Sequence, residues 1–87
     1  MHYAIFYKKP VAKELRKITP VDRAAIIKKI QSLSDDPFPV GAVLLQGAAR
    51  WYRVRSGDYR IIYEVQQQKV VVLIIKVGHR REVYRAS

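Results

Sequence analysis

The chain of 87 residues contains no cysteine, which excludes a disulfide framework and a thiolate metal site. Acidic residues are scarce, with 7 Asp and Glu against 17 Lys and Arg, and the formal net charge is +10. The longest unbroken apolar run, residues 70–75, is far shorter than the roughly 20 residues needed to cross a bilayer. The charge predicts an anionic partner: nucleic acid first, a membrane surface or an acidic protein next. We expect a cytoplasmic protein without a membrane partner.

Motifs that hold a metal or a phosphate-bearing cofactor are also missing. The sequence has no pair of histidines at helical spacing, no carboxylate cluster that suits a metal and no glycine-rich phosphate loop. No arrangement of serine, histidine and aspartate suggests a nucleophile. We expect no cofactor and no metal, so any catalysis has to depend on arginine, tyrosine and His79.

Apolar periodicity predicts two helices in the first half of the chain. One apolar stripe is formed by Val11, Leu15 and Ile18, which recur at helical spacing. Pro20 ends this helix, because the residue before a proline avoids the helical region, and it suits the first turn of the next helix. The second helix then runs to residues 35–39, where aspartates and prolines stop it.

The remaining segments read mainly as strands. They are an opening strand at residues 2–8, a hairpin at 50–65 and a continuous β-branched run at 69–77, which is typical of a strand covered on both faces. Residues 40–49 are expected to form a loop, and residues 79–85 a tail that returns to the sheet edge. The predicted order is β-α-α-β-β-β, a single α+β domain over residues 1–87 with a helical hairpin packed on an antiparallel-rich sheet.

The hairpin is the most informative stretch of the sequence. Gly57 and Asp58 suit a two-residue turn. This turn sets the register of the two strands and pairs Arg55 with Arg60, Val54 with Ile61, Arg53 with Ile62 and Tyr52 with Tyr63. Side chains alternate between the faces of a strand, so Arg53, Arg55 and Arg60 share one face. Like charges opposite one another destabilise a sheet, and the cluster therefore predicts an absent anionic partner, with phosphate the first candidate.

Charge and aromatic residues concentrate in the same half of the chain. Residues 50–85 carry nine basic and three acidic groups, a net charge of +6, whereas residues 1–49 carry +4. Arginine grips phosphate with a planar fork, and the predicted register puts Trp51 on the face of the arginines, where it can stack on a base. The candidate RNA-binding residues outside the cluster are Trp51, Arg50 and Arg81.

Plainer interpretations compete with this one. A basic hairpin is often only a solvated face of a protein. Tyr52, Tyr59 and Tyr63 fall on the face opposite the arginines and are expected in the core. His79 alone would be structural or solvent-facing, and it gains interest because basic residues such as Arg80 stand next to it.

Four pieces of the sequence carry a family resemblance. They are LQG at residues 45–47, WYRVR at 51–55, GDYRIIY at 57–63 and VGHRREVY at 77–84. Together they closely resemble the RelE toxins of bacterial and archaeal toxin–antitoxin systems, and the two helices fit in order and length. The resemblance covers nearly the whole chain. It implies the compact fold of the RelE/ParE superfamily, which is related to small microbial ribonucleases.

The resemblance also implies an activity. RelE proteins cut messenger RNA in the ribosomal A site without a metal: the messenger's 2′-hydroxyl attacks the adjacent phosphate and leaves a 2′,3′-cyclic phosphate and a 5′-hydroxyl. The implied partners are a ribosome with mRNA in its A site and a cognate antitoxin protein. The implied catalytic residues are Arg53, Arg55, Arg60, Arg80 and Tyr84. Among them, Arg60 and Arg80 are expected to clamp the phosphate charge, and Tyr84 to stack on a base or position the 2′-hydroxyl.

The chain departs from the family pattern in its hairpin, because the best-known members have lysine where this chain has Arg53 and Arg55. A buried lysine can lose its proton near neutral pH and arginine effectively cannot, so neither residue is expected to be the general base. His79 can exchange a proton near neutral pH and is the candidate for acid–base catalysis. Two alternative functions stay open: a ParE-like inhibitor of DNA gyrase, and a basic RNA-binding relative without catalysis.

Overall fold

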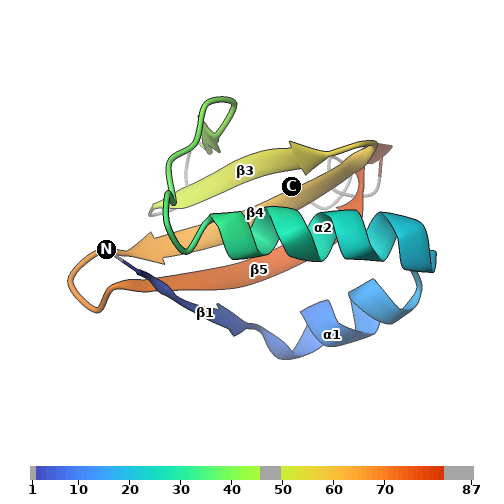
Figure 1. The fold of residues 1–87 in the computed structure, drawn as a ribbon, viewed down its shortest axis with the longest axis horizontal. Coiled ribbons are helices and arrows are strands. Elements are labelled where there is room, and N and C mark those ends of the chain that lie inside the picture. Colours follow the sequence, from blue (N-terminus) through green and yellow to red (C-terminus); the bar gives the residue numbers. More distant parts are fainter. Residues whose placement is uncertain (1, 46–49, 82–87) are drawn as a thin grey trace.

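The computed structural model describes residues 2–45 and 50–81 (Figure 1). In these residues two helices pack against one face of a mixed sheet. The helices are α1 (Lys9–Arg16) and α2 (Pro20–Ser32). The strands are β1 (Ala4–Tyr7), β2 (Val43–Leu44), β3 (Trp51–Ser56), β4 (Tyr59–Gln66) and β5 (Val71–His79). No helix in this part of the chain is long and apolar enough to span a membrane.

The strands follow the order β1-β5-β4-β3-β2 across the sheet. β1 runs parallel to β5, and all other neighbouring strands are antiparallel. Figure 1 shows α2 lying over one face of the sheet and running along the strands, with α1 below it near the end of β5. The predicted α+β class, with a helical hairpin on an antiparallel-rich sheet, is confirmed.

The core lies between the helices and the sheet. Apolar side chains at helical spacing on the helices meet alternate apolar side chains of β3, β4 and β5. The buried members are Val11, Ile18, Ile26, Ile30, Leu33, Val54, Ile61, Tyr63, Val65, Val72, Ile74 and Val77. Tyr63 is fully buried, and its hydroxyl donates a hydrogen bond of 2.7 Å to the carbonyl oxygen of Pro37. Burial raises the pKa of the Tyr63 hydroxyl, so this group stays a neutral donor.

The hairpin has the predicted register in full. Arg55 lies opposite Arg60, and Tyr52 lies opposite Tyr63, with the intervening pairs as expected. Gly57 has a φ of 60°, in the left-handed region that suits glycine in a tight turn. Tyr52 stacks on Tyr63 with ring centroids 5.9 Å apart, and it packs against the core, as does Tyr59. The expectation that these tyrosines belong to the core is therefore confirmed.

Two details of the sheet differ from the expectation. Residues 43–44 form the short edge strand β2 inside segment 40–49, for which the sequence predicts a loop. β5 is covered on one face only: Val72 and Ile74 are buried under the helices, whereas Val71 and Leu73 on the other face are half-buried. A run of β-branched residues suits a strand in either environment, so the sequence pattern does not separate the two.

Candidate active site

Three arginines lie on the sheet face that the helices leave open. Arg53 and Arg55 come from β3 and Arg60 from β4, at positions that alternate with the core residues Val54 and Ile61. We call Arg53, Arg55 and Arg60 the arginine face. Arg55 and Arg60 are direct neighbours in the ladder, so the fold holds two like charges opposite each other. The structure thus brings together the three hairpin arginines that the sequence singled out.

Arg60 differs from its neighbours in its burial, since only 6% of its surface is exposed, whereas Arg55 is exposed. Its partner in β5 is Gly78, which adds no side chain to this face of the sheet. The charge of a buried guanidinium is weakly screened by water and acts strongly on an anion placed next to it. Sequence reasoning missed Gly78 because a register irregularity at Ile62/Tyr63 shifts the β4–β5 pairing.

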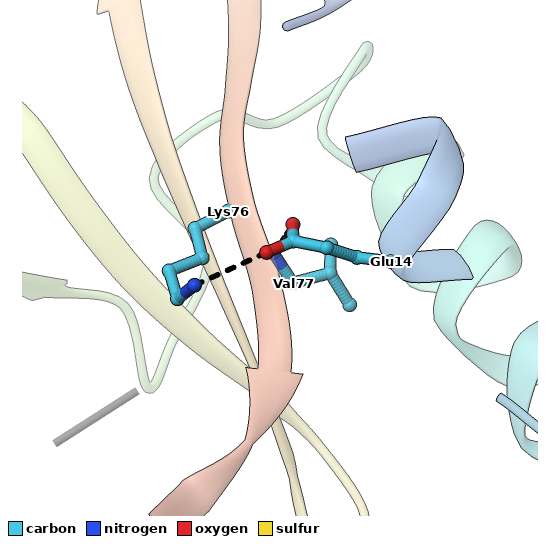
Figure 2. Close-up of polar contacts among 3 residues, drawn as sticks. All are labelled: Glu14, Lys76 and Val77. Carbon is cyan, nitrogen blue, oxygen red and sulfur yellow. Dashed lines mark hydrogen bonds and ion pairs between the residues drawn. The ribbon is translucent and has the colours of Figure 1, made fainter. Parts of the chain in front are cut away.

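The end of β5 is held from both sides, and this fixes the backbone of Arg80. The Arg80 backbone N–H donates a hydrogen bond of 2.9 Å to the carbonyl oxygen of Asp58 in the β3–β4 turn. On the other side, Glu14 of α1 accepts hydrogen bonds from the Val77 backbone N–H at 3.0 Å and from Lys76 Nζ at 3.1 Å (Figure 2). β1 does not extend this far along β5, so Glu14 satisfies an edge N–H that β1 leaves open.

His79 lies on the other side of the sheet from the arginine face. It pairs with Tyr59 across the β4–β5 ladder, and the two rings meet edge to face at a centroid distance of 5.8 Å. The His79 Nδ1 atom is 3.4 Å from the Arg81 backbone nitrogen and accepts its hydrogen bond. His79 also lines a hollow of about 260 Å³ together with Glu14, Lys17, Ile18, Tyr59, Val77 and Gly78. The structure therefore does not bring His79 together with the three hairpin arginines.

Trp51 lies on the same face as the arginines, as predicted, and its indole is anchored. The Trp51 Nε1–H group donates a hydrogen bond of 3.3 Å to Glu64 Oε2, and the Gln66 amide donates one of 2.6 Å to Glu64 Oε1. Glu64 is directly opposite Trp51 in the ladder. Glu64 and Gln66 thus orient the indole, and sequence reasoning missed both, although the hairpin register already paired Glu64 with Trp51.

The other predicted site residues lie at the two ends of the sheet. Arg50 precedes β3, has a φ of 59° and lines a hollow of about 410 Å³ beside the β4–β5 turn, together with Lys69. Arg80 and Arg81 follow β5 and are exposed. Tyr84 lies outside the described residues. Within the described residues, no group of three or more histidine, cysteine or carboxylate side chains could hold a metal ion.

The sequence and the fold both match known toxins. The chain matches the family model described as ParE toxin of type II toxin-antitoxin system, parDE, over residues 5–84. It is 35% identical to the mRNA interferase toxin RelE of Escherichia coli over 88 residues, which covers 97% of this chain and 92% of that protein. It is 30% identical to toxin RelG of Mycobacterium tuberculosis over 86 residues, which covers 98% and 99%. The solved toxin–antitoxin complex RelBE2 from M. tuberculosis contains a chain that matches with a TM-score of 0.81 and 28% identity, covering 92% of this chain and 100% of that chain.

These matches extend over nearly the whole chain and include the hairpin that bears the three arginines. The chain belongs to the RelE/ParE family of toxins from type II toxin–antitoxin systems. Within this family it is a RelE-type toxin, since its curated relatives are RelE and RelG and its fold is that of a toxin chain in a RelBE complex. The resemblance given by the sequence motifs is thereby confirmed.

Proposed function

We propose that this toxin is a ribosome-dependent endoribonuclease, an mRNA interferase that cuts the messenger in the A site without a metal and so inhibits translation in the cytoplasm. The observation that carries the proposal is the arginine face, in which Arg60 is buried and faces a glycine across β5. The E. coli relative bears the name of an mRNA interferase toxin, which supports the same activity here.

The proposed reaction forms one bond and breaks one. The 2′-oxygen of the nucleotide before the cut attacks the adjacent phosphorus, and the bond from phosphorus to the 5′-oxygen breaks. The 2′-hydroxyl gives up its proton, and the leaving 5′-oxygen takes one. The products are a 2′,3′-cyclic phosphate and a 5′-hydroxyl, and the transition state carries extra negative charge on the phosphate oxygens.

The arginines suit the stabilisation of this charge. In our assignment Arg60 and Arg80 clamp the pentavalent phosphate, because one is buried on the open face and the other is fixed beside the adjacent turn. Arg53 and Arg55 hold the flanking phosphates, and arginine at these positions supplies charge and hydrogen bonds without acting as a base. Trp51, whose indole is oriented by Glu64, stacks on a base. Tyr84 stays a predicted residue for stacking or for positioning the 2′-hydroxyl.

His79 has a different proposed task from the one that the sequence suggested. Its ring lies against Tyr59 on the helix side, and its Nδ1 accepts the Arg81 N–H, so we assign it to holding the start of the tail. An asparagine can replace the acceptor atom without replacing the proton chemistry. We therefore expect His79→Asn to cut at close to the wild-type rate. A large loss in His79→Asn with normal ribosome binding would restore the acid–base role.

A cognate antitoxin is the second proposed partner. The M. tuberculosis relative of known structure forms a toxin–antitoxin complex, and this chain has the same fold. A toxin with a net charge of +10 favours an acidic antitoxin segment. We expect that segment to cover or distort the arginine face and so to compete with the messenger.

The test uses ribosomes programmed with an mRNA, with an occupied P site and an empty A site. Primer extension should map a single cut in the A-site codon, and the upstream product should end in a 2′,3′-cyclic phosphate. A messenger with a 2′-deoxy nucleotide at the cut should stay intact. Arg60→Ala should abolish cleavage, whereas Lys28→Ala, which changes an exposed cation on α2, should not. A phosphorothioate at the cut that a thiophilic metal rescues would contradict the metal-free mechanism.

Inhibition of DNA gyrase is the second candidate function, because the matching family model is described by the ParE toxin. A ParE-like toxin would leave the messenger intact, would not bind the ribosome and would inhibit DNA supercoiling by purified gyrase. Intact messenger with normal ribosome binding would instead indicate an RNA-binding relative without catalysis.

A further inference from the structure

α1 carries a second group of cations on a different element from the arginine face. Lys13 lies four residues after Lys9, and Arg16 and the C-cap residue Lys17 lie three and four residues after Lys13, which places all four on one side of the helix. All four are exposed, whereas Val11 on the opposite side is buried in the core. We call these four residues the α1 stripe.

Part of the α1 stripe is unfavourable for the helix that bears it. Lys9 and Lys13 are like charges four residues apart, as are Lys13 and Lys17, and such pairs destabilise a helix. The first turn of α1 contains no acidic residue, and Lys9 places a cation at the positive end of the helix dipole. Lys13 and Arg16, by contrast, lie in the last turn, where a cation is favourable, so the cost to the helix comes from Lys9 and from the two like-charge pairs.

The acidic residue of α1 does not neutralise the stripe. Glu14 turns toward β5, where its two carboxylate oxygens accept hydrogen bonds from Lys76 and from the Val77 backbone (Figure 2). Across residues 2–45 and 50–81, no carboxylate lies within ion-pair distance of the four cations. Among the described residues, nothing neutralises the stripe, and its exposed cations are accessible to an external anion.

We propose that the α1 stripe docks on the phosphate backbone of ribosomal RNA. This inference rests on the proposed function, which places the toxin in an A site that ribosomal RNA encloses, so that phosphates surround more than the messenger-binding face. Successive lysines of the stripe are about 6 Å apart along the helix axis, close to the spacing of phosphates in an RNA strand. Lysine is a hydrated point charge that contacts phosphate irrespective of the RNA sequence. The arginine face instead has planar guanidinium groups, which bind a phosphate through two hydrogen bonds in a defined geometry.

The stripe also reaches the end of β5, on the helix side of the sheet and opposite the arginine face. Lys17 lines the same hollow as Gly78 and His79, and Gly78 is the partner of Arg60 in the sheet. Docking of α1 on ribosomal RNA would therefore also hold the end of β5, because Glu14 of α1 is hydrogen-bonded to the backbone of that strand. The messenger and the arginine face would be brought into one defined orientation.

The test measures binding to programmed ribosomes in an Arg60→Ala background, so that cleavage does not interfere. Lys9→Gln/Lys13→Gln removes two charges from the stripe, and the matched control Lys28→Gln/Lys69→Gln removes two exposed charges elsewhere. Each lysine–phosphate contact contributes roughly 0.7–0.9 to the slope of log affinity against log salt. Between 50 and 200 mM salt, the stripe variant should therefore lose about 10-fold less affinity than the parent, and the control variant should follow the parent.

Equal salt slopes for the stripe and control variants would overturn the inference, and so would a stripe variant that binds ribosomes normally but binds the antitoxin weakly. Circular dichroism should show that the stripe variant melts no lower than the parent, since like charges have been removed. In the wild-type background, equal cleavage rates for the parent and the stripe variant would refute the docking and leave the proposed function standing. Stripe-dependent ribosome binding without any cleavage would support the docking and contradict the proposed function.

Discussion

The burial of Arg60 predicts that this residue contributes more to cleavage than Arg55, its direct neighbour across the ladder. The two guanidiniums lie on the same sheet face, but 6% of Arg60 is exposed, whereas Arg55 is open to water. Water screens an exposed charge and weakens its effect on a phosphate, and a buried charge is screened much less. The two arginines thus provide a comparison within one site.

The expected magnitudes follow from this difference in screening. Arg60→Ala should slow cleavage by about 100- to 1,000-fold, the loss typical when one preorganised donor to a developing charge is removed. Arg60→Lys keeps the charge but loses the fork, and we expect an intermediate loss of about 10- to 100-fold. Arg55→Ala should cost about 10-fold or less, because an exposed ion pair contributes about 1 kcal/mol at most.

The assay is single-turnover cleavage on programmed ribosomes with the toxin in excess, which separates the chemical step from product release. Thermal unfolding of each variant serves as the control for folding. A loss in Arg55→Ala that equals or exceeds the loss in Arg60→Ala would refute the argument from burial. An Arg60→Ala chain that is unfolded at the assay temperature would make Arg60→Lys the deciding comparison.

Three further predictions concern stability and binding. Tyr63→Phe leaves the buried Pro37 carbonyl without its 2.7 Å hydrogen bond and should lower the unfolding free energy by about 1–2 kcal/mol, with cleavage unchanged. Because burial raises the pKa of Tyr63 above its ordinary value of 10.0, this residue stabilises the fold below pH 10 and ceases to do so as the pH rises further; denaturation at several pH values should show a weaker alkaline loss in Tyr63→Phe. Glu14→Ala leaves the Val77 N–H unpaired and should cost about 1–2 kcal/mol, or roughly 4–16 °C in melting temperature, whereas Glu14→Gln keeps an acceptor and should cost less. Trp51→Ala should weaken binding to the programmed ribosome by about 5- to 150-fold, the loss of one stacked base, and Trp51→Phe should recover most of it.

Local rules were sufficient to predict the hairpin and its arginines. A two-residue turn at Gly57 and Asp58 determines the register, and alternation then decides which side chains share a face. The partner of Arg60 in β5 could not be predicted in the same way. The bulge at Ile62/Tyr63 shifts the pairing of β4 with β5, and no residue type in the sequence indicates this bulge.

The placement of His79 and of Glu14 depended on contacts that are distant in sequence. The sequence groups His79 with the arginines because Arg80 follows it, but the ladder pairs His79 with Tyr59 on the helix side and pairs Gly78, its neighbour in β5, with Arg60. The bond between Glu14 and the β5 edge joins residues 63 positions apart, and it arises only because β1 ends before that part of β5. Such a contact follows from the order of strands in the sheet, which the pattern of one sequence does not determine.

The chemistry of the arginine face would account for the dependence on the ribosome that we propose. Guanidinium groups stay protonated, so this face supplies positive charge and hydrogen bonds and does not abstract the 2′-hydroxyl proton. A site of this kind accelerates cleavage only if the attacking 2′-oxygen already stands in line with the leaving 5′-oxygen, and correct orientation alone can contribute about 7–11 kcal/mol. A free single strand samples that geometry rarely. The ribosome would hold the messenger bent for in-line attack, and phosphates of ribosomal RNA along α1 would hold the toxin. The messenger would then reach the arginine face in the geometry that cleavage needs.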